Sequence, residues 1–207
     1  MEIADLISPA SVVANLRVGS KKQALQDLAK RAAETTGLSE RAIFEVLLER
    51  ERLGTTGVGN GIAIPHGKLP GLRRLYGLFA RLETPIDFDS VDEQPVDLIF
   101  LLLAPEAAGA DHLKALARVS RLLRDRAVCE KLRGADQADA MYALLTESAA
   151  SHAARTPPRR QWTLTGSRPF WRTVAKASSR VSATARDEPS AAWMAKPVRS
   201  SSVTGFT

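Results

Sequence analysis

Hydrophobic positions in the first 150 residues alternate between helical spacing and short continuous runs, which predicts an α/β domain. The first predicted helix starts with a capping box of Ser20 and Gln23 and closes before Gly37. The second is capped by Ser39 and stops at Gly54. The positions expected to face the core are Ala24, Leu25, Leu28, Ala29 and Ala32 in the first helix and Ile43, Phe44, Leu47 and Leu48 in the second.

Apolar runs and a second set of helical periods complete the predicted domain. Strands are expected over residues 62–64, 74–82 and 96–104. The last run is apolar at consecutive positions, so we expect a central strand covered by helices on both faces. After it we predict a helix over 111–124, a short segment over 127–132 and a last helix capped by Asp136. The inward positions expected in the two helices are Leu113, Leu116, Ala117, Leu123, Met141, Tyr142 and Leu145.

The last quarter of the chain differs in composition. Residues 155–207 hold five prolines, eight serines and all three tryptophans, and no apolar period persists in them for two turns. We therefore predict one domain over residues 1–150 and a disordered basic tail over 151–207. One hypothesis is that the tail is a foreign or shifted-frame extension. Finding no homologue-like C-terminus in another reading frame of the gene would count against it.

The net charge of +6 is unevenly distributed. Residues 1–154 carry 19 Lys+Arg and 21 Asp+Glu, a net charge of −2, whereas residues 155–207 carry 10 and 2, a net charge of +8. No nucleic-acid partner is therefore expected for the folded domain. Contact of the tail with nucleic acid or acidic membranes stays open, because basic segments with interspersed aromatics bind phosphates.

Composition and motifs exclude several other classes. The single cysteine, Cys129, rules out a disulfide scaffold and is expected to be buried and inert. The acidic N-terminus and the short apolar runs argue against export and membrane insertion, so a cytoplasmic protein is expected. The glycine-rich run 57–62 lacks the last glycine of a dinucleotide site, and Gly67-Lys68 lacks the Ser/Thr of a P-loop. Nor is a metal-binding motif present, and we expect no metal and no cofactor.

His66 is the best candidate for a reactive group. It follows an apolar strand, where open α/β sheets place ligands, and it stands between Pro65 and Gly67. Because its unperturbed pKa is about 6.5, the imidazole is mostly neutral at pH 7 and keeps a lone pair for nucleophilic attack. Attack on a phosphoryl group would need fixed positive charge and hydrogen-bond donors nearby. The alternative is a structural histidine.

Residues near His66 in the sequence could supply this positive charge and these hydrogen-bond donors. Arg50 and Arg52 end the second helix, and a guanidinium suits a phosphoryl group well. The backbone N–H groups of the glycine loop, at Gly59, Asn60 and Gly61, could bind phosphate as well. The alternative for Arg50 is a solvated helix-end residue.

His112 shares a helical face with Leu116, Val119 and Leu123, which predicts an inward direction. Its place in the first turn of the helix favours a neutral imidazole. The alternative is a half-buried structural histidine. Lys68 is a candidate for guiding a partner electrostatically.

Three sequence blocks occur in the order ERERLGTTGVGNGIAIPHGKL, ETPIDFDSVDEQPVDLIFLLLAP and DHLKALARVSRLL. Together they resemble the IIA components of the bacterial phosphoenolpyruvate-dependent phosphotransferase system over residues 1–150. The stretches 62–68 and 94–97 look more like the nitrogen-regulatory branch than the mannitol and fructose branches. The resemblance implies a three-layer α/β/α sandwich around a mixed β-sheet, to which this chain adds a tail that the family lacks.

The resemblance also implies roles for single residues. In this family the histidine of the PHG block accepts a phosphoryl group from a histidine phosphocarrier protein, which maps onto His66. The flanking arginine and histidine map onto Arg50 and His112. The implied activity is a phosphotransferase relay with mainly regulatory output on targets such as potassium transporters or sensor kinases. The alternative is a sugar-specific relay that passes phosphate to a IIB permease domain, although no fused IIB or IIC segment is seen.

Overall fold

The computed structural model describes residues 2–155, with side chains described up to residue 147, and all of them belong to one compact unit, Met1–Arg159. The helices are α1 (Lys21–Thr36), α2 (Glu40–Arg52), α3 (Gly109–Leu123), α4 (Arg126–Gly134) and α5 (Ala138–Arg155), with short 3-10 turns η1 (Ile3–Asp5), η2 (Pro9–Ser11) and η3 (Glu106–Ala108). The strands are β1 (Val12–Leu16), β2 (Gly57–Gly59), β3 (Ile62–Ala63), β4 (His66–Leu69), β5 (Tyr76–Ile86) and β6 (Val96–Pro105). None of the helices within residues 2–155 combines the length and apolar character needed to cross a bilayer.

The strands form one mixed sheet in the order β1-β5-β6-β3-β2. β5 and β6 pair antiparallel over most of their length, and β1 lies parallel to β5. On the other side of β6, β3 and β4 follow one another along the same edge, both parallel to β6, with Ile62 opposite Leu98 and His66 opposite Leu102. The sheet edge that carries His66 is therefore held by the central strand.

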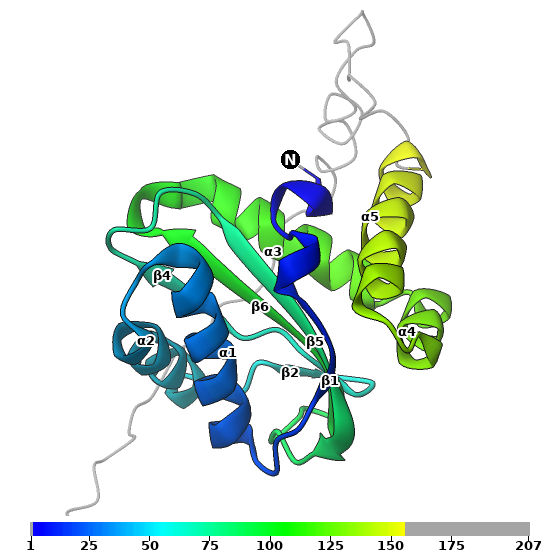
Figure 1. The fold of residues 1–207 in the computed structure, drawn as a ribbon, viewed down its shortest axis with the longest axis horizontal. Helices are drawn as coiled ribbons and strands as arrows, with labels where there is room; N and C mark the ends of the chain where they lie inside the picture. Colours follow the sequence, from blue (N-terminus) through cyan, green and yellow to red (C-terminus); the bar gives the residue numbers. More distant parts are fainter. Residues whose placement is uncertain (1, 156–207) are drawn as a thin grey trace, which may run out of the picture. The chain divides into compact units, whose positions relative to one another are not determined.

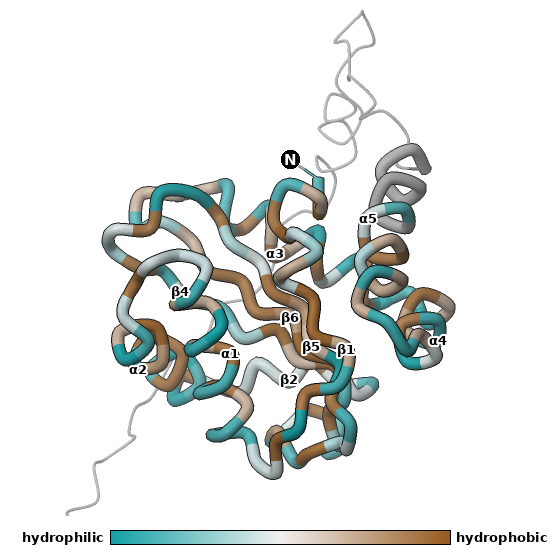
Figure 2. The backbone as a smooth tube through the Cα atoms, viewed as in Figure 1, coloured by the Kyte–Doolittle hydropathy of each residue, from teal (hydrophilic) through white to brown (hydrophobic). Residues whose placement is uncertain are grey.

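Helices cover both faces of this sheet (Figure 1), which confirms the three-layer α/β/α prediction. Alternate residues of β6 explain why. Leu98, Phe100 and Leu102 belong to a core cluster with α3, α4 and α5, whereas Ile99, Leu101 and Leu103 belong to a second cluster with α1 and α2. Figure 2 shows the matching pattern: hydrophobic residues are concentrated along β5 and β6, and hydrophilic residues occur on the outer helices. Burial on both faces is what a continuous apolar strand predicts.

The predicted caps of the first two helices are confirmed. The Ser20 side chain accepts a hydrogen bond from the Gln23 N–H, and the Gln23 side chain reaches back to the N–H of Gly19 rather than of Ser20. The Ser39 side chain accepts from the Ala42 N–H. Gly37 ends α1 in the left-handed conformation, with φ of 73°. Local sequence therefore sets where these helices begin and end.

Several predicted boundaries and directions are wrong. The segment over 127–132 is a full helix, α4, and α5 begins at Ala138, so Gln137 rather than Asp136 precedes it. Leu113 is 65% exposed and Ala117 is also exposed, because the buried face of α3 carries His112, Ala115, Val119, Leu122 and Leu123.

The first strand and the length of the last helix were not predicted from the sequence. β1 was not anticipated, since its five residues contain only a short apolar run. At the other end, α5 continues to Arg155, five residues beyond the predicted domain boundary. The rest of the predicted tail lies outside the described residues.

Candidate functional site

His66 follows the short apolar strand β3, as the sequence suggested, and is itself the first residue of β4. The chain leaves β3 at Ala63 and returns to β6 at His66, and the Leu102 N–H donates to the Pro65 carbonyl between them. The side chain is half-buried and faces a cavity of about 640 Å³ between the end of α2, β4 and the start of α3. The imidazole is thus held by a strand and open to a partner.

The two nitrogens of His66 have different partners. Nδ1 lies 2.8 Å from the carbonyl oxygen of Ile64, and Nε2 lies 3.0 Å from Nε of Arg50. A carbonyl can only accept and a guanidinium can only donate, so the proton sits on Nδ1 and the lone pair sits on Nε2. The ring is therefore a neutral imidazole whose Nε2 is the nucleophilic atom.

Electrostatics favour the same neutral form. Burial lowers the pKa of His66 below its ordinary value, and the nearby Arg50 charge lowers it further. The hydrogen bond to Ile64 and the charge of Glu51 raise the pKa but do not outweigh these effects. At neutral pH the lone pair of Nε2 is available without prior loss of a proton.

Arg50 is positioned by the last turn of α2. Its Nη1 donates to the carbonyl of Gly54 at 2.9 Å, just beyond the helix end, while its Nε donates to His66. The guanidinium is consequently not the solvated helix-end group that was the alternative. It brings a fixed positive charge and further N–H donors to the nucleophilic nitrogen.

His112 lies in the first turn of α3 and is buried, with 6% of its surface exposed. Its ring centroid is 5.8 Å from that of His66, with the two planes inclined by 48°. Burial lowers its pKa, and the charges of His66 and Lys68 lower it further. Within the described part of the chain, its buried Nδ1 has no hydrogen-bond partner. A buried polar atom without a partner is costly. The His112 side chain also lines the cavity that His66 faces.

The cavity includes residues that the sequence analysis did not single out. Its lining consists of Val46, Glu49, Arg50, Arg52, Leu53, His66, Gly67, Lys68 and His112. Val46, Glu49 and Leu53 stand one helical turn from Arg50 or its neighbours, so helical spacing could have found them. Leu53 is 86% exposed, which leaves an apolar side chain at the rim. Lys68 does line the cavity, in keeping with its suggested guiding role.

A partly buried ion pair supports the end of α2 next to Arg50. The Glu51 carboxylate is 2.8 Å from Lys21 Nζ and accepts hydrogen bonds from the backbone N–H and the hydroxyl of Thr56. Burial acts to lower the pKa of Lys21, but its hydrogen bonds to Glu51 and Asp89 outweigh burial and raise the pKa. These contacts join α1, α2 and β2, so they hold the backbone from which Arg50 projects.

The structure does not bring the predicted phosphate-binding loop together with His66. Gly59 ends β2, Asn60 and Gly61 form the turn to β3, and none of the three lines the His66 cavity. The Asn60 N–H is already donated to Asp92, and the Asn60 carbonyl accepts from Arg133. A Cβ on Gly61 would meet Arg133 and Asp97 below 3.0 Å. Close packing therefore explains the glycine there.

The fold and this site together define the class of protein. It is an α/β/α domain with a neutral histidine in its sheet that accepts a hydrogen bond from an arginine. The family model described as "Phosphoenolpyruvate-dependent sugar phosphotransferase system, EIIA 2" matches residues 5–148. The chain therefore belongs to this family, and the resemblance drawn from the sequence blocks is confirmed.

Individual relatives show which branch of the family the chain resembles. A nitrogen regulatory protein of Bradyrhizobium diazoefficiens is 65% identical over 145 residues, which is 70% of this chain and 95% of the relative. A nitrogen regulatory protein of Klebsiella oxytoca is 41% identical over 155 residues, 74% of this chain and 96% of the relative. The crystal structure of nitrogen regulatory protein IIA-Ntr from Neisseria meningitidis aligns with a TM-score of 0.67 at 36% identity, covering 70% of this chain and 99% of that one. These similarities support the nitrogen-regulatory branch over a sugar-specific one.

Proposed function

We propose that the protein is a nitrogen-regulatory IIA protein that accepts a phosphoryl group on Nε2 of His66 from a histidine phosphocarrier protein. The observation that carries this proposal is a pair of hydrogen bonds on the His66 ring. Nδ1 donates to the Ile64 carbonyl, and Nε2 accepts from Arg50. These hydrogen bonds place the proton on Nδ1 and the lone pair on Nε2. Family membership supplies the class of reaction, a phosphotransfer between proteins.

The transfer needs no separate base. In the structure the lone pair of Nε2 accepts a hydrogen bond from Arg50. When the guanidinium turns from it to an equatorial oxygen of the incoming phosphoryl group, the lone pair attacks the phosphorus of the phosphohistidine on the carrier. A P–N bond forms to His66, and the P–N bond to the carrier breaks with its electron pair returning to the carrier ring. The proton on Nδ1 of His66 stays hydrogen-bonded to the Ile64 carbonyl. Arg50 balances the charge on the equatorial oxygens, and His112, whose side chain lines the same cavity, orients the phosphoryl group.

The output of this reaction is regulatory. A phosphoryl group adds about −1.5 to −2 charges to a neutral side chain, enough to make or break a protein interface. Its targets would be proteins of nitrogen or potassium metabolism, such as potassium transporters or sensor kinases. Similarity to proteins named nitrogen regulatory protein supports this output over transfer to a sugar. We place the protein in the cytoplasm, where phosphoenolpyruvate is available to the donor.

The test is phosphorylation by the reconstituted relay. The full chain is incubated with phosphoenolpyruvate, the first enzyme of the relay and the phosphocarrier, and acid-labile phosphate is measured together with ¹⁵N and ³¹P spectra of the labelled ring. We expect one phosphate per chain on Nε2 of His66 and none on a His66→Gln variant. His152→Gln, outside the described side chains, is the matched control and keeps full label.

Two results would overturn the proposal. Label that persists in the His66→Gln variant would remove this residue from the role. Label on Nδ1 in the wild-type protein would show that the hydrogen bonds to Ile64 and Arg50 do not select the reacting nitrogen.

A further inference from the structure

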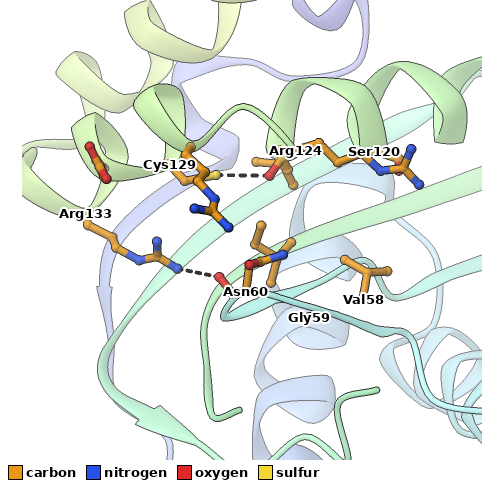
Figure 3. Close-up of a pocket in the computed structure, with 11 residues that line it drawn as sticks. Val58, Gly59, Asn60, Ser120, Arg124, Cys129 and Arg133 are labelled. Atoms are coloured by element: carbon orange, nitrogen blue, oxygen red, sulfur yellow. Dashed lines mark hydrogen bonds between the residues drawn. The ribbon is translucent and has the colours of Figure 1, made fainter. Parts of the chain in front are cut away.

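A second cavity, of about 310 Å³, lies away from His66, between the β2–β3 turn and the junction of α3 and α4. Figure 3 shows Val58, Gly59 and Asn60 on one side of it and Ser120, Arg124, Cys129 and Arg133 on the helical side. None of its lining residues belongs to the His66 cavity. Nothing in the proposed phosphotransfer uses this part of the molecule.

Three guanidinium groups line the cavity, and they differ in how they are partnered. Arg133 is paired side-on with Asp97, through contacts of 2.6 and 2.8 Å, and also donates to the Asn60 carbonyl at 2.9 Å. Arg124 and Arg126 are exposed, and among the side chains of residues 2–147 neither has a hydrogen-bond or ion-pair partner. Arg133 is therefore structural, whereas Arg124 and Arg126 are free to bind an anion.

Other groups in the lining restrict the ligand. Glu130 is the one carboxylate among the lining residues, so the arginines leave the cavity positively charged even after Asp97 is counted against Arg133. The Cys129 thiol is occupied by the Leu123 carbonyl at 3.1 Å, and burial raises its pKa. It does not act as an anionic or reactive group. Ser120 adds a hydroxyl.

Apolar side chains complete the lining. Val58 and Ile62 come from the β2–β3 side and Leu123 from the end of α3. Val58 is 52% exposed, which is unusual for a large aliphatic side chain in a short strand. An exposed aliphatic group that faces two unpaired guanidiniums fits a ligand with an oxyanion at one end and a small apolar group at the other.

The size and chemistry of the cavity exclude other occupants. About 310 Å³ is at the lower end of the range for small-molecule sites, too small for a folded segment of a partner protein. The chain beyond residue 154 carries a net charge of +8 and is a poor match for arginines. The start of α4 offers no separate anion site, because the Asp125 carboxylate already accepts from the N–H groups of Ala127 and Val128.

We infer that the cavity between the β2–β3 turn and the α3–α4 junction binds a small organic oxyanion, a phosphate ester or carboxylate with a compact apolar group, through Arg124 and Arg126. The apolar group packs on Val58 and Leu123. Arg133 and Asp97 hold the two walls together through the Asn60 carbonyl.

Phenyl phosphate, benzoate and inorganic phosphate are suitable probes. Each is titrated into the ¹⁵N-labelled full chain, and the amide signals of Gly59, Asn60 and Cys129 are followed. We expect saturable shifts at these amides, with phenyl phosphate or benzoate binding more tightly than inorganic phosphate because of the apolar side chains in the lining. The aromatic probe that binds more tightly identifies the ligand as a phosphate ester or a carboxylate.

Variants separate this site from other anion-binding positions. Arg124→Ala/Arg126→Ala should weaken binding about tenfold or more, since hydrogen bonds to charged groups are lost. Arg121→Ala, an exposed arginine of α3 outside the lining, is the matched control and should bind as the wild type does. Because these side chains are exposed, unchanged spectra elsewhere verify that the variants fold.

Three outcomes would overturn the inference. The first is equal affinity in the double variant and the Arg121→Ala control. The second is a response centred on the amides of His66, Gly67 and Lys68, which would assign the anion to the phosphotransfer site. The third is a response confined to residues beyond 155. None of these depends on whether His66 accepts phosphate, so failure here leaves the proposed function untouched.

Discussion

The proton on His66 is positioned by two partners that can each play only one role. Ile64 offers a carbonyl, which must accept, and Arg50 offers a guanidinium, which must donate. Burial and the Arg50 charge both lower the pKa of the ring. The arginine that we propose to balance a bound phosphoryl group thus also favours the neutral form of the His66 ring.

This double role of Arg50 can be tested by Arg50→Ala. Loss of the guanidinium should raise the pKa of His66 above its wild-type value, because a charge that lowers it is gone. It should also slow phosphoryl transfer about a hundredfold, the usual cost of losing one donor to a developing oxyanion. The pKa is measured by NMR titration of the ring and the rate by rapid quench with the phosphocarrier.

Arg52→Ala is the matched control for the titration, since Arg52 lines the same cavity but is not among the causes of the His66 pKa shift. It should leave the pKa of His66 unchanged. An unaltered pKa and an unaltered rate in Arg50→Ala would contradict the double role.

The contact between α2 and β4 depends on a missing side chain. A Cβ on Gly67 would lie 2.5 Å from Cγ1 of Val46, closer than real Cβ contacts. The glycine that follows His66 therefore lets the helix that carries Arg50 approach the strand that carries His66. The residue that this glycine accommodates is Val46.

Gly67→Ala should therefore destabilise the fold by about 1–3 kcal/mol, the usual cost of overpacking a tight contact. The double variant Gly67→Ala/Val46→Ala should recover part of that loss, because the colliding Cγ1 is removed. Urea denaturation of wild type, both single variants and the double variant measures the coupling. Strictly additive effects of the two substitutions would show that Val46 is not the residue that requires glycine.

His66, which is half-buried, and His112, which is buried, link the site to the stability of the whole domain. Burial lowers the pKa of both His66 and His112 below 6.5 in the folded chain. The unfolded chain, with ordinary histidines, then binds more protons at mildly acidic pH, so acid favours unfolding. The stabilisation from keeping these rings neutral is complete above pH 6.5 and is lost as the pH falls towards the lowered values.

We expect the free energy of unfolding to fall between about pH 6.5 and about pH 5, above the range in which carboxylates titrate. In His66→Gln/His112→Gln this dependence should be much flatter, whatever the absolute stability of the variant. Urea denaturation at several pH values gives the slopes. Parallel slopes for the variant and the wild type would rule out a contribution from these histidines.

Local patterns in the sequence were enough to predict the class of fold and to nominate the three side chains that meet at the His66 cavity. Some features depend only on residues that are neighbours in the chain, so they can be predicted from the sequence. These are the helix caps at Ser20, Ser39 and Gly37 and the apolar run of β6. The PHG block and the blocks around it predicted family membership for the same reason, since they are contiguous. His66, Arg50 and His112 were nominated in this way.

Geometry between distant segments could not be predicted. The choice of Nε2 as the nucleophile depends on Ile64 and Arg50 meeting one ring from opposite sides, and the loop at Gly59 to Gly61 faces Arg133 and Asp92 instead of His66. Leu113 points outward because the register of α3 is set by packing on the sheet, not by its own polarity. Sequence determines which groups a chain carries and where its helices start, while contacts formed on folding determine which of those groups meet, because burial and pairing energies depend on distance in space.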